Sequence, residues 1–290
     1  MKQILICIFL FAGFALCGQN TQYAKGDFDF IYYLIGNDFK EDALAIIRNK
    51  DVKPSLNTPY ADSMHFISGW TYYSCHKLDS ASLMLDLVSD FSPLHAQSRL
   101  FSCLSYAHWG GQYAKARSAL NGLKSEDNGI LQLKTYTQGA LALLERNIGE
   151  FDSCFALLNT HDMRFESEKA ELLSLRNEIN AHKPKSLWLA GALSSVVPGL
   201  GKVYAGNLGE GISAFLMTGS FMAATAENWY RKGFNNWKTL LFATFSAVFY
   251  TGNIYGSVSA AKMSNVIFNG KKDVQILYNI HIPIRNGFRH

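Results

Sequence analysis

The sequence predicts an all-α protein in two parts, a helical-repeat region followed by a region of apolar helices. A helix–turn–helix phrase recurs four times between residues 26 and 160. After Lys183-Pro184-Lys185, charged residues are absent from three segments, 186–201, 211–226 and 239–261. The first pattern is typical of a solenoid of repeats. The second is typical of helices in an apolar environment, so a boundary is expected near residue 185.

Composition limits the classes of function. The 290 residues are enough for one large or two modest domains. A formal charge of +4 is spread along the chain without a basic block, which argues against a nucleic-acid partner. Charged residues make up only 17% of the chain and aromatic residues 13%. This balance favours contacts with apolar surfaces.

The N-terminus predicts a secretory signal peptide over residues 1–18. An apolar run from Ile4 to Leu16 follows a basic residue and precedes small residues, the usual order in such peptides. Cleavage is expected after Gly18. Two alternatives stay open, an uncleaved anchor and a lipoprotein attached through Cys17, although Leu16 stands where a lipoprotein signal favours Gly or Ala.

Each repeat phrase has a short turn, then an aromatic residue or Leu, then a small residue. The phrases begin at Leu34, Cys75, His108 and Arg146. The small residues recur about every 35–38 positions, and they are Ala43, Ala81, Ala116 and Cys154. Two helices joined by a tight turn lie closest near that turn. A small side chain there is therefore expected to pack between the paired helices.

Residues 26–160 resemble the tetratricopeptide repeat, with "GGQYAKA" and "IGEFDSC" as the best matches. The Trp-Leu-Gly and terminal Pro positions of that family are mostly missing. The resemblance implies a solenoid over 19–163 whose surface binds a protein or peptide. Residues 164–185 are expected to form a connecting or capping helix. Four tyrosines are candidates for the binding surface, although core packing is the more frequent role: Tyr32, Tyr33, Tyr72 and Tyr73.

The second part, 186–268, predicts a membrane domain. A helix over 187–197 is expected to be interfacial or re-entrant, and transmembrane helices are expected at about 206–226 and 239–260. A third span is the alternative for the first of these segments. In the last span, Gly252, Asn253 and Gly256 are predicted helix-packing residues, because a G-x-x-x-G spacing permits close contact and an internal Asn usually bonds a neighbouring helix.

The stretch "SSVVPGLGKVYAGNLGEG" before the first span is rich in glycine. It fails as a phosphate-binding loop, because Val196 and Val203 occupy the Gly and hydroxyl positions that flank Gly201-Lys202. It resembles a bacterial membrane-domain family with a Pro-Gly-x-Gly-x-x-Tyr-x-Gly motif before a helical hairpin. Lys202 departs from the usual Gln. The residues that carry the motif are Pro198, Gly199, Gly201, Tyr204, Gly206 and Gly211.

The C-terminal tail, 269–290, alternates apolar and polar residues. Val274, Ile276, Tyr278, Ile280 and Ile282 follow a two-residue period, which predicts a strand. One strand needs a partner strand, and no other segment offers the same pattern.

No catalytic constellation, metal-ligand spacing or cofactor motif stands out, so we expect a protein that is not an enzyme and has no cofactor. The expected function is a membrane-anchored scaffold at the bacterial inner membrane, whose exported repeats bind a protein or peptide of the envelope. The alternative is a function of the membrane domain in oligomerisation, assembly, insertion or transport. The lipid bilayer and a second copy of the chain are therefore further expected partners.

Overall fold

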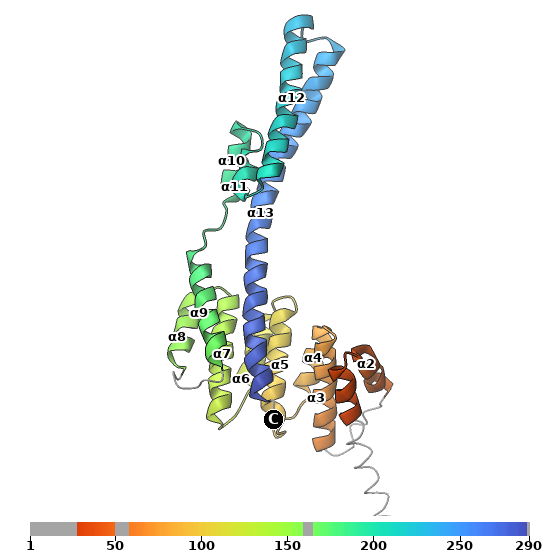
Figure 1. The fold of residues 1–290 in the computed structure, drawn as a ribbon, viewed down its shortest axis with the longest axis vertical. Helices are drawn as coiled ribbons and strands as arrows, with labels where there is room; N and C mark the ends of the chain where they lie inside the picture. Colours follow the sequence, from red (N-terminus) through yellow and green to blue (C-terminus); the bar gives the residue numbers. More distant parts are fainter. Residues whose placement is uncertain (1–27, 50–57, 159–164, 289–290) are drawn as a thin grey trace, which may run out of the picture. The chain divides into compact units, whose positions relative to one another are not determined.

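A computed structural model describes residues 28–49, 58–158 and 165–288 (Figure 1). These residues form helices and turns, and no strand occurs among them, which confirms the all-α class. The predicted signal peptide, 1–18, lies outside the described residues. The chain divides into two compact units, Met1–Ser174 with Ile276–His290, and Leu175–Gln275. We call them the repeat unit and the hairpin unit.

The repeat unit has a helix pair at each of the four predicted places. The first pair joins a helix over 28–36 to α2 (Lys40–Asn49). The others are α3 (Thr58–Ser74) with α4 (Leu78–Asp86), α5 (His95–His108) with α6 (Tyr113–Asn121), and α7 (Asn128–Leu144) with α8 (Ile148–Ala156). The first helices of successive pairs pack together, α3 on α5 and α5 on α7. A continuous inner layer of first helices results.

Small residues lie where the paired helices approach most closely. Ala43, Ala81 and Ala116 are fully buried, as expected, while Cys154 is only partly buried. On the facing helix the small residue is often glycine. A Cβ on Gly139 would lie 2.8 Å from the Phe155 ring and 3.2 Å from Cys154 Cβ. In the pair of α7 and α8, Gly139 and Cys154 thus keep both sides of the contact small.

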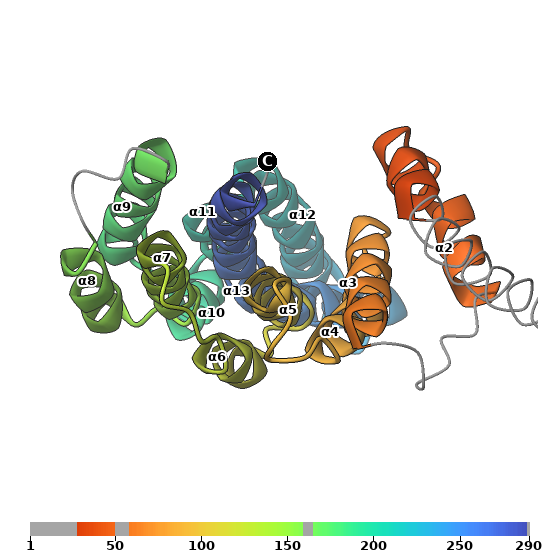
Figure 2. The ribbon, with the colours of Figure 1, turned by 90° about the horizontal axis from the view of Figure 1, so that it is seen from below.

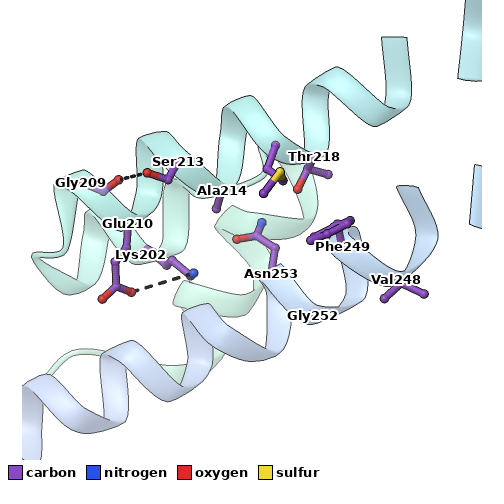
Figure 3. Close-up of a pocket in the computed structure, with 11 residues that line it drawn as sticks. Lys202, Gly209, Glu210, Ser213, Ala214, Thr218, Val248, Phe249, Gly252 and Asn253 are labelled. Atoms are coloured by element: carbon purple, nitrogen blue, oxygen red, sulfur yellow. Dashed lines mark hydrogen bonds and ion pairs between the residues drawn. The ribbon is translucent and has the colours of Figure 1, made fainter. Parts of the chain in front are cut away.

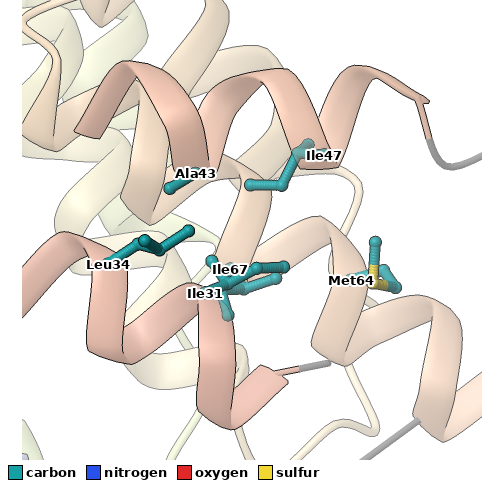
Figure 4. Close-up of a cluster of buried hydrophobic side chains, with 6 residues drawn as sticks. All are labelled: Ile31, Leu34, Ala43, Ile47, Met64 and Ile67. Carbon is teal, nitrogen blue, oxygen red and sulfur yellow. The ribbon is translucent and has the colours of Figure 1, made fainter. Parts of the chain in front are cut away.

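The first pair shows how each repeat builds its core. Ile31 and Leu34 pack with Ala43 and Ile47 across the turn, and all four side chains are buried (Figure 4). Met64 and Ile67 of α3 complete the cluster from the next repeat. Because each pair buries its apolar face against the following pair, the repeats stabilise one another.

The hairpin unit contains the end of α9 (Glu166–Ala181), then α10 (Leu187–Val196) and α11 (Leu200–Ala205). Its two long helices are α12 (Leu208–Lys232) and the first part of α13 (Trp237–Gly287). The Ser186 hydroxyl caps α10 by accepting a hydrogen bond from the Leu189 N–H at 3.3 Å. The predicted helix 187–197 therefore starts as expected and ends just before Pro198.

The transmembrane prediction for 206–226 and 239–260 is wrong in this structure. Both segments are helical, as parts of α12 and α13, but no helix among the described residues combines the length and apolarity needed to cross a bilayer. The reason is that uncharged residues are not all apolar. Hydroxyl and amide side chains interrupt both segments, among them Ser213, Thr218, Ser220, Thr244, Ser246, Thr251 and Asn253.

The predicted C-terminal strand is also wrong, because α13 continues to Gly287 through Pro283. The apolar residues of the tail fit a helical period as well as a two-residue one. Ile276, Ile280 and Ile284 recur every fourth residue, so they lie on one face of the helix, and all three are buried.

Candidate functional site

The inner layer of the repeat unit holds the C-terminal end of the chain's own α13. Figure 2 shows this end of α13 flanked by α3, α5 and α7. We call residues 276–287 the docked segment, and we call the side chains that contact it the inner face. The inner face includes Tyr73 of α3, Phe101 of α5, and Leu133 and Tyr136 of α7.

Apolar burial is the largest contribution to this docking. Ile276, Ile280 and Ile284 are at most 1% exposed, whereas Tyr278 on the same helix is 64% exposed. Burying one such aliphatic side chain contributes about 1.5–3 kcal/mol relative to leaving it in water. The docked segment is therefore an amphipathic helix with its apolar stripe turned to the repeats.

His281 packs against an aromatic cluster on the inner face. Trp70, Tyr73 and Phe101 have ring centroids 4.9–5.8 Å apart. The imidazole of His281 stacks on Tyr73 at 5.6 Å and meets Phe101 edge-on at 6.3 Å. Among the tyrosines considered from the sequence, Tyr73 is the one that contacts the docked segment, while Tyr32 and Tyr33 are exposed.

His281 is also hydrogen-bonded, with Tyr73 Oη and His281 Nδ1 2.7 Å apart. Burial raises the pKa of Tyr73, so its hydroxyl keeps its proton and can donate. Burial, and then the charge of Arg285, lower the pKa of His281. The neutral imidazole is favoured, and its Nδ1 accepts the bond from Tyr73.

A second hydrogen bond replaces the backbone hydrogen bond that is missing at Pro283. Proline has no N–H, so the carbonyl oxygen of Asn279, four residues earlier, loses its partner within the helix. The Tyr136 hydroxyl donates to that oxygen at 3.0 Å. Tyr136 is itself fully buried. The inner face thus contains a donor placed against the carbonyl to which Pro283 cannot donate.

A cavity of about 320 Å³ lies beside Pro283. Its lining includes Leu133 and Phe165, with Asp127 and Asn286 as polar members. Sequence reasoning did not single out Tyr136, His281 or Pro283. The signal available in the sequence was a proline inside an apolar i, i+4, i+8 pattern. Such a proline leaves the carbonyl four residues earlier in need of a donor from another part of the chain.

The glycine motif of the hairpin unit forms one tightly packed element. Gly199 and Gly206 have φ of 90° and 102°, which is accessible to glycine at little cost. A Cβ on Gly201 would overlap the Ala190 carbonyl oxygen, and one on Gly211 would lie 2.5 Å from a Val203 methyl. These glycines let α10, α11 and α12 meet backbone to backbone.

Pro198 and Tyr204 complete the motif. Pro198 lies in the turn after α10, and the Tyr204 hydroxyl accepts a hydrogen bond from the Ser186 N–H at 3.0 Å. The ammonium of Lys185 lies 5.0 Å from the centroid of the Tyr204 ring. The six motif residues therefore lie together in the turns and close helix contacts that join α10, α11 and α12.

The packing role predicted for Gly252, Asn253 and Gly256 is wrong in its details. Gly252 is exposed, and no atom would lie within 4 Å of a Cβ there. Gly256 faces the end of the Lys202 side chain rather than a helix backbone. Asn253 is buried, but its amide makes no hydrogen bond to a neighbouring helix. The G-x-x-x-G spacing therefore does not mark a close helix contact here.

The described residues contain no group of three or more His, Cys, Asp or Glu side chains arranged to hold a metal ion. No protein-family model matches the chain, and neither a curated protein nor a solved structure matches it significantly.

Proposed function

We propose that this protein is a helical-repeat interaction scaffold whose inner face binds an amphipathic helix of a partner protein. The observation that supports this most directly is the docked segment, because it is an amphipathic helix that packs on the inner face. Recognition of a helix through apolar anchors at i, i+4 and i+8 is a recurring mode of peptide binding.

In this proposal the docked segment competes with the partner. A ligand that belongs to the same chain has an effective concentration of roughly millimolar, so it excludes weaker ligands. A partner helix gains access when its affinity is higher or when the docked segment is released. The proposed ligand has isoleucine-sized anchors on one face and an imidazole or aromatic group that can stack on Tyr73.

The proposal is tested by opening the site and adding the segment back. In the full chain, Ile280→Asp places a charge in the apolar interface and is expected to release the docked segment. A synthetic peptide of residues 271–290 should then bind the variant measurably more tightly than it binds the unchanged chain. Calorimetry measures both affinities, and circular dichroism checks that the repeats stay helical.

Two controls make the experiment specific. Tyr278→Asp adds the same charge to an exposed position of the same helix and should not increase peptide binding. A peptide that itself carries Ile280→Asp should not bind the opened chain. If the folded Ile280→Asp chain does not bind the unchanged peptide, the inner face is not a helix-binding site and the proposal fails.

Self-association of the hairpin unit is a second candidate function. Phe215, Leu216 and Val248 are 50–61% exposed on α12 and α13, and further apolar residues are exposed near them. Extended apolar surfaces of this kind mark sites of association. The expected partner is a second copy, and Phe215→Ser with Leu216→Ser should lower the mass measured by sedimentation. An unchanged mass, or a monomer before mutation, would contradict this.

The exported location remains part of the proposal and depends on the N-terminal segment 1–18, which is expected to direct export and then to be cleaved. Detection of mature chains that begin at Gln19 in the envelope fraction would support it. Full-length chains in the cell interior would contradict it.

A further inference from the structure

The hairpin unit contains a cleft. It has a volume of about 720 Å³ and is bordered by α11, α12 and α13. Its apolar lining includes Met217, Val248 and Phe249, and its polar lining residues are Lys202, Glu210, Ser213, Thr218 and Asn253. The volume lies in the range of small-molecule sites, and an apolar wall with few polar groups is their usual composition.

Asn253 is the unusual group in this cleft. It is 5% exposed, and neither its Oδ1 nor its Nδ2 has a hydrogen-bond partner. In Figure 3 its amide lies between α12 and α13, directed toward Ala214 and Thr218. A buried amide without partners destabilises the fold, so it calls for an explanation. It offers a ligand one donor side and one acceptor.

Two buried hydroxyl groups near Asn253, those of Ser194 and Ser257, are paired. Ser194 Oγ and Ser257 Oγ lie 2.6 Å apart, and Ser194 Oγ also accepts a hydrogen bond from the Gly201 N–H at 2.9 Å. Ser257 is one helical turn from Asn253. The unit therefore satisfies these two hydroxyl groups and leaves the amide of Asn253, a residue that lines the cleft, without a partner.

Lys202 places a positive charge near Asn253. Its side chain is 20% exposed, and its Cε would lie 3.3 Å from a Cβ on Gly256, which is one turn along α13 from Asn253. The ammonium is 4.0 Å from a carboxylate oxygen of Glu210, a residue that is itself 65% exposed. A long ion pair with an exposed partner is weak. Most of the donor capacity of the ammonium therefore remains for an anion.

We propose that this cleft binds an N-acyl amino acid, a molecule in which an apolar chain is joined through an amide to a free carboxylate. The ligand N–H donates to Asn253 Oδ1, and a carboxylate oxygen accepts from Asn253 Nδ2. The same carboxylate pairs with Lys202. The acyl chain lies along Met217, Val248 and Phe249. A plain fatty acid lacks the N–H and leaves Asn253 Oδ1 unpaired.

A matched set of ligands tests this assignment on the full chain by calorimetry. The probe is N-dodecanoylglycine. Dodecanoate lacks the amide, the methyl ester of N-dodecanoylglycine lacks the charge, and N-acetylglycine lacks the chain. N-Dodecanoylglycine should bind about tenfold or more tightly than each of the other three. Equal binding of dodecanoate and N-dodecanoylglycine, or no binding of the probe, would overturn the proposal.

Variants identify the residues. Asn253→Leu should weaken binding of the probe about tenfold or more, while it raises the thermal midpoint of the ligand-free protein by about 2–4 °C, since an unpaired amide is removed. Loss of binding in a protein that has become more stable cannot come from unfolding. Lys202→Met should weaken binding of the probe but leave binding of its methyl ester unchanged. Lys271→Met, an exposed lysine outside the cleft, is the control and should change neither.

Unchanged affinity in both Asn253→Leu and Lys202→Met would show that the acyl chain alone drives binding, and the proposed site would then be wrong.

Discussion

The two units hold their helices together in different ways. On the inner face, large side chains carry the contact: three isoleucines are buried, and two tyrosines supply the hydrogen bonds. In the glycine motif, side chains are absent where the helices meet, and backbone approaches backbone. In our proposal the first arrangement can release and rebind a helix, because side chains can repack. The second fixes its helices, because backbone positions have little freedom to adjust.

The two sites also differ in how they treat buried polar groups. Asn279 and His281 find partners on the inner face, whereas the amide of Asn253 finds none in the cleft. The inner face is complete within this chain. The cleft is incomplete, and this contrast is the reason to expect an external ligand at the cleft and competition with a partner at the inner face.

The largest effect is expected from Gly201→Ala, which tests the backbone contact. A Cβ would overlap the Ala190 carbonyl oxygen and approach Ser194 Oγ, so α10 and α11 must separate. We expect a loss of about 3 kcal/mol in the free energy of unfolding. Denaturant titration measures it. Gly252→Ala is the matched control, and it should stabilise by about 0.5–1 kcal/mol because its surroundings are open. Equal effects at both glycines would refute the distinction.

An intermediate effect is expected from Tyr136→Phe, which tests the side-chain contact. The Asn279 carbonyl loses its donor in a buried site, at a cost of about 1–3 kcal/mol. Pro283→Ala supplies an N–H within the helix, so Tyr136→Phe should cost less in that background. A double-mutant cycle on denaturant titrations measures the coupling. Independent, additive effects would mean that Tyr136 does not compensate for Pro283.

The smallest effect is expected from pH. The pKa of His281 is lowered from its ordinary value of 6.5, so the folded state binds its proton less well than the unfolded state. Docking is therefore fully stable above pH 6.5 and weakens as the pH falls below it. Protonation of Nδ1 also removes the acceptor for Tyr73. Proteolysis of the C-terminus should become faster in mild acid.

His281→Gln serves as the comparison for the pH effect, because its amide keeps an acceptor and does not titrate. If acid accelerates cleavage equally in His281→Gln, another group is responsible. A difference confined to the unchanged chain would identify His281 as the residue that makes the inner face sensitive to pH.

Features that depend on neighbours along the chain could be predicted from the sequence. The helical class, the four helix pairs, the buried alanines after the first three turns, and the end of α10 before Pro198 follow from periodicity, small residues and backbone restrictions. Those signals act within a few residues. The same reasoning located the glycine motif and rejected a phosphate-binding role for it.

Tertiary structure decided the rest, because it depends on contacts between distant residues. Tyr136 and Asn279 are 143 positions apart, and no local pattern shows that one donates to the other. The isoleucines of the tail fit a strand and a helix equally well until the inner face covers one side of them. Likewise, Asn253 has the sequence signature of a helix-packing residue. The position of α12 is what leaves its amide buried without a partner.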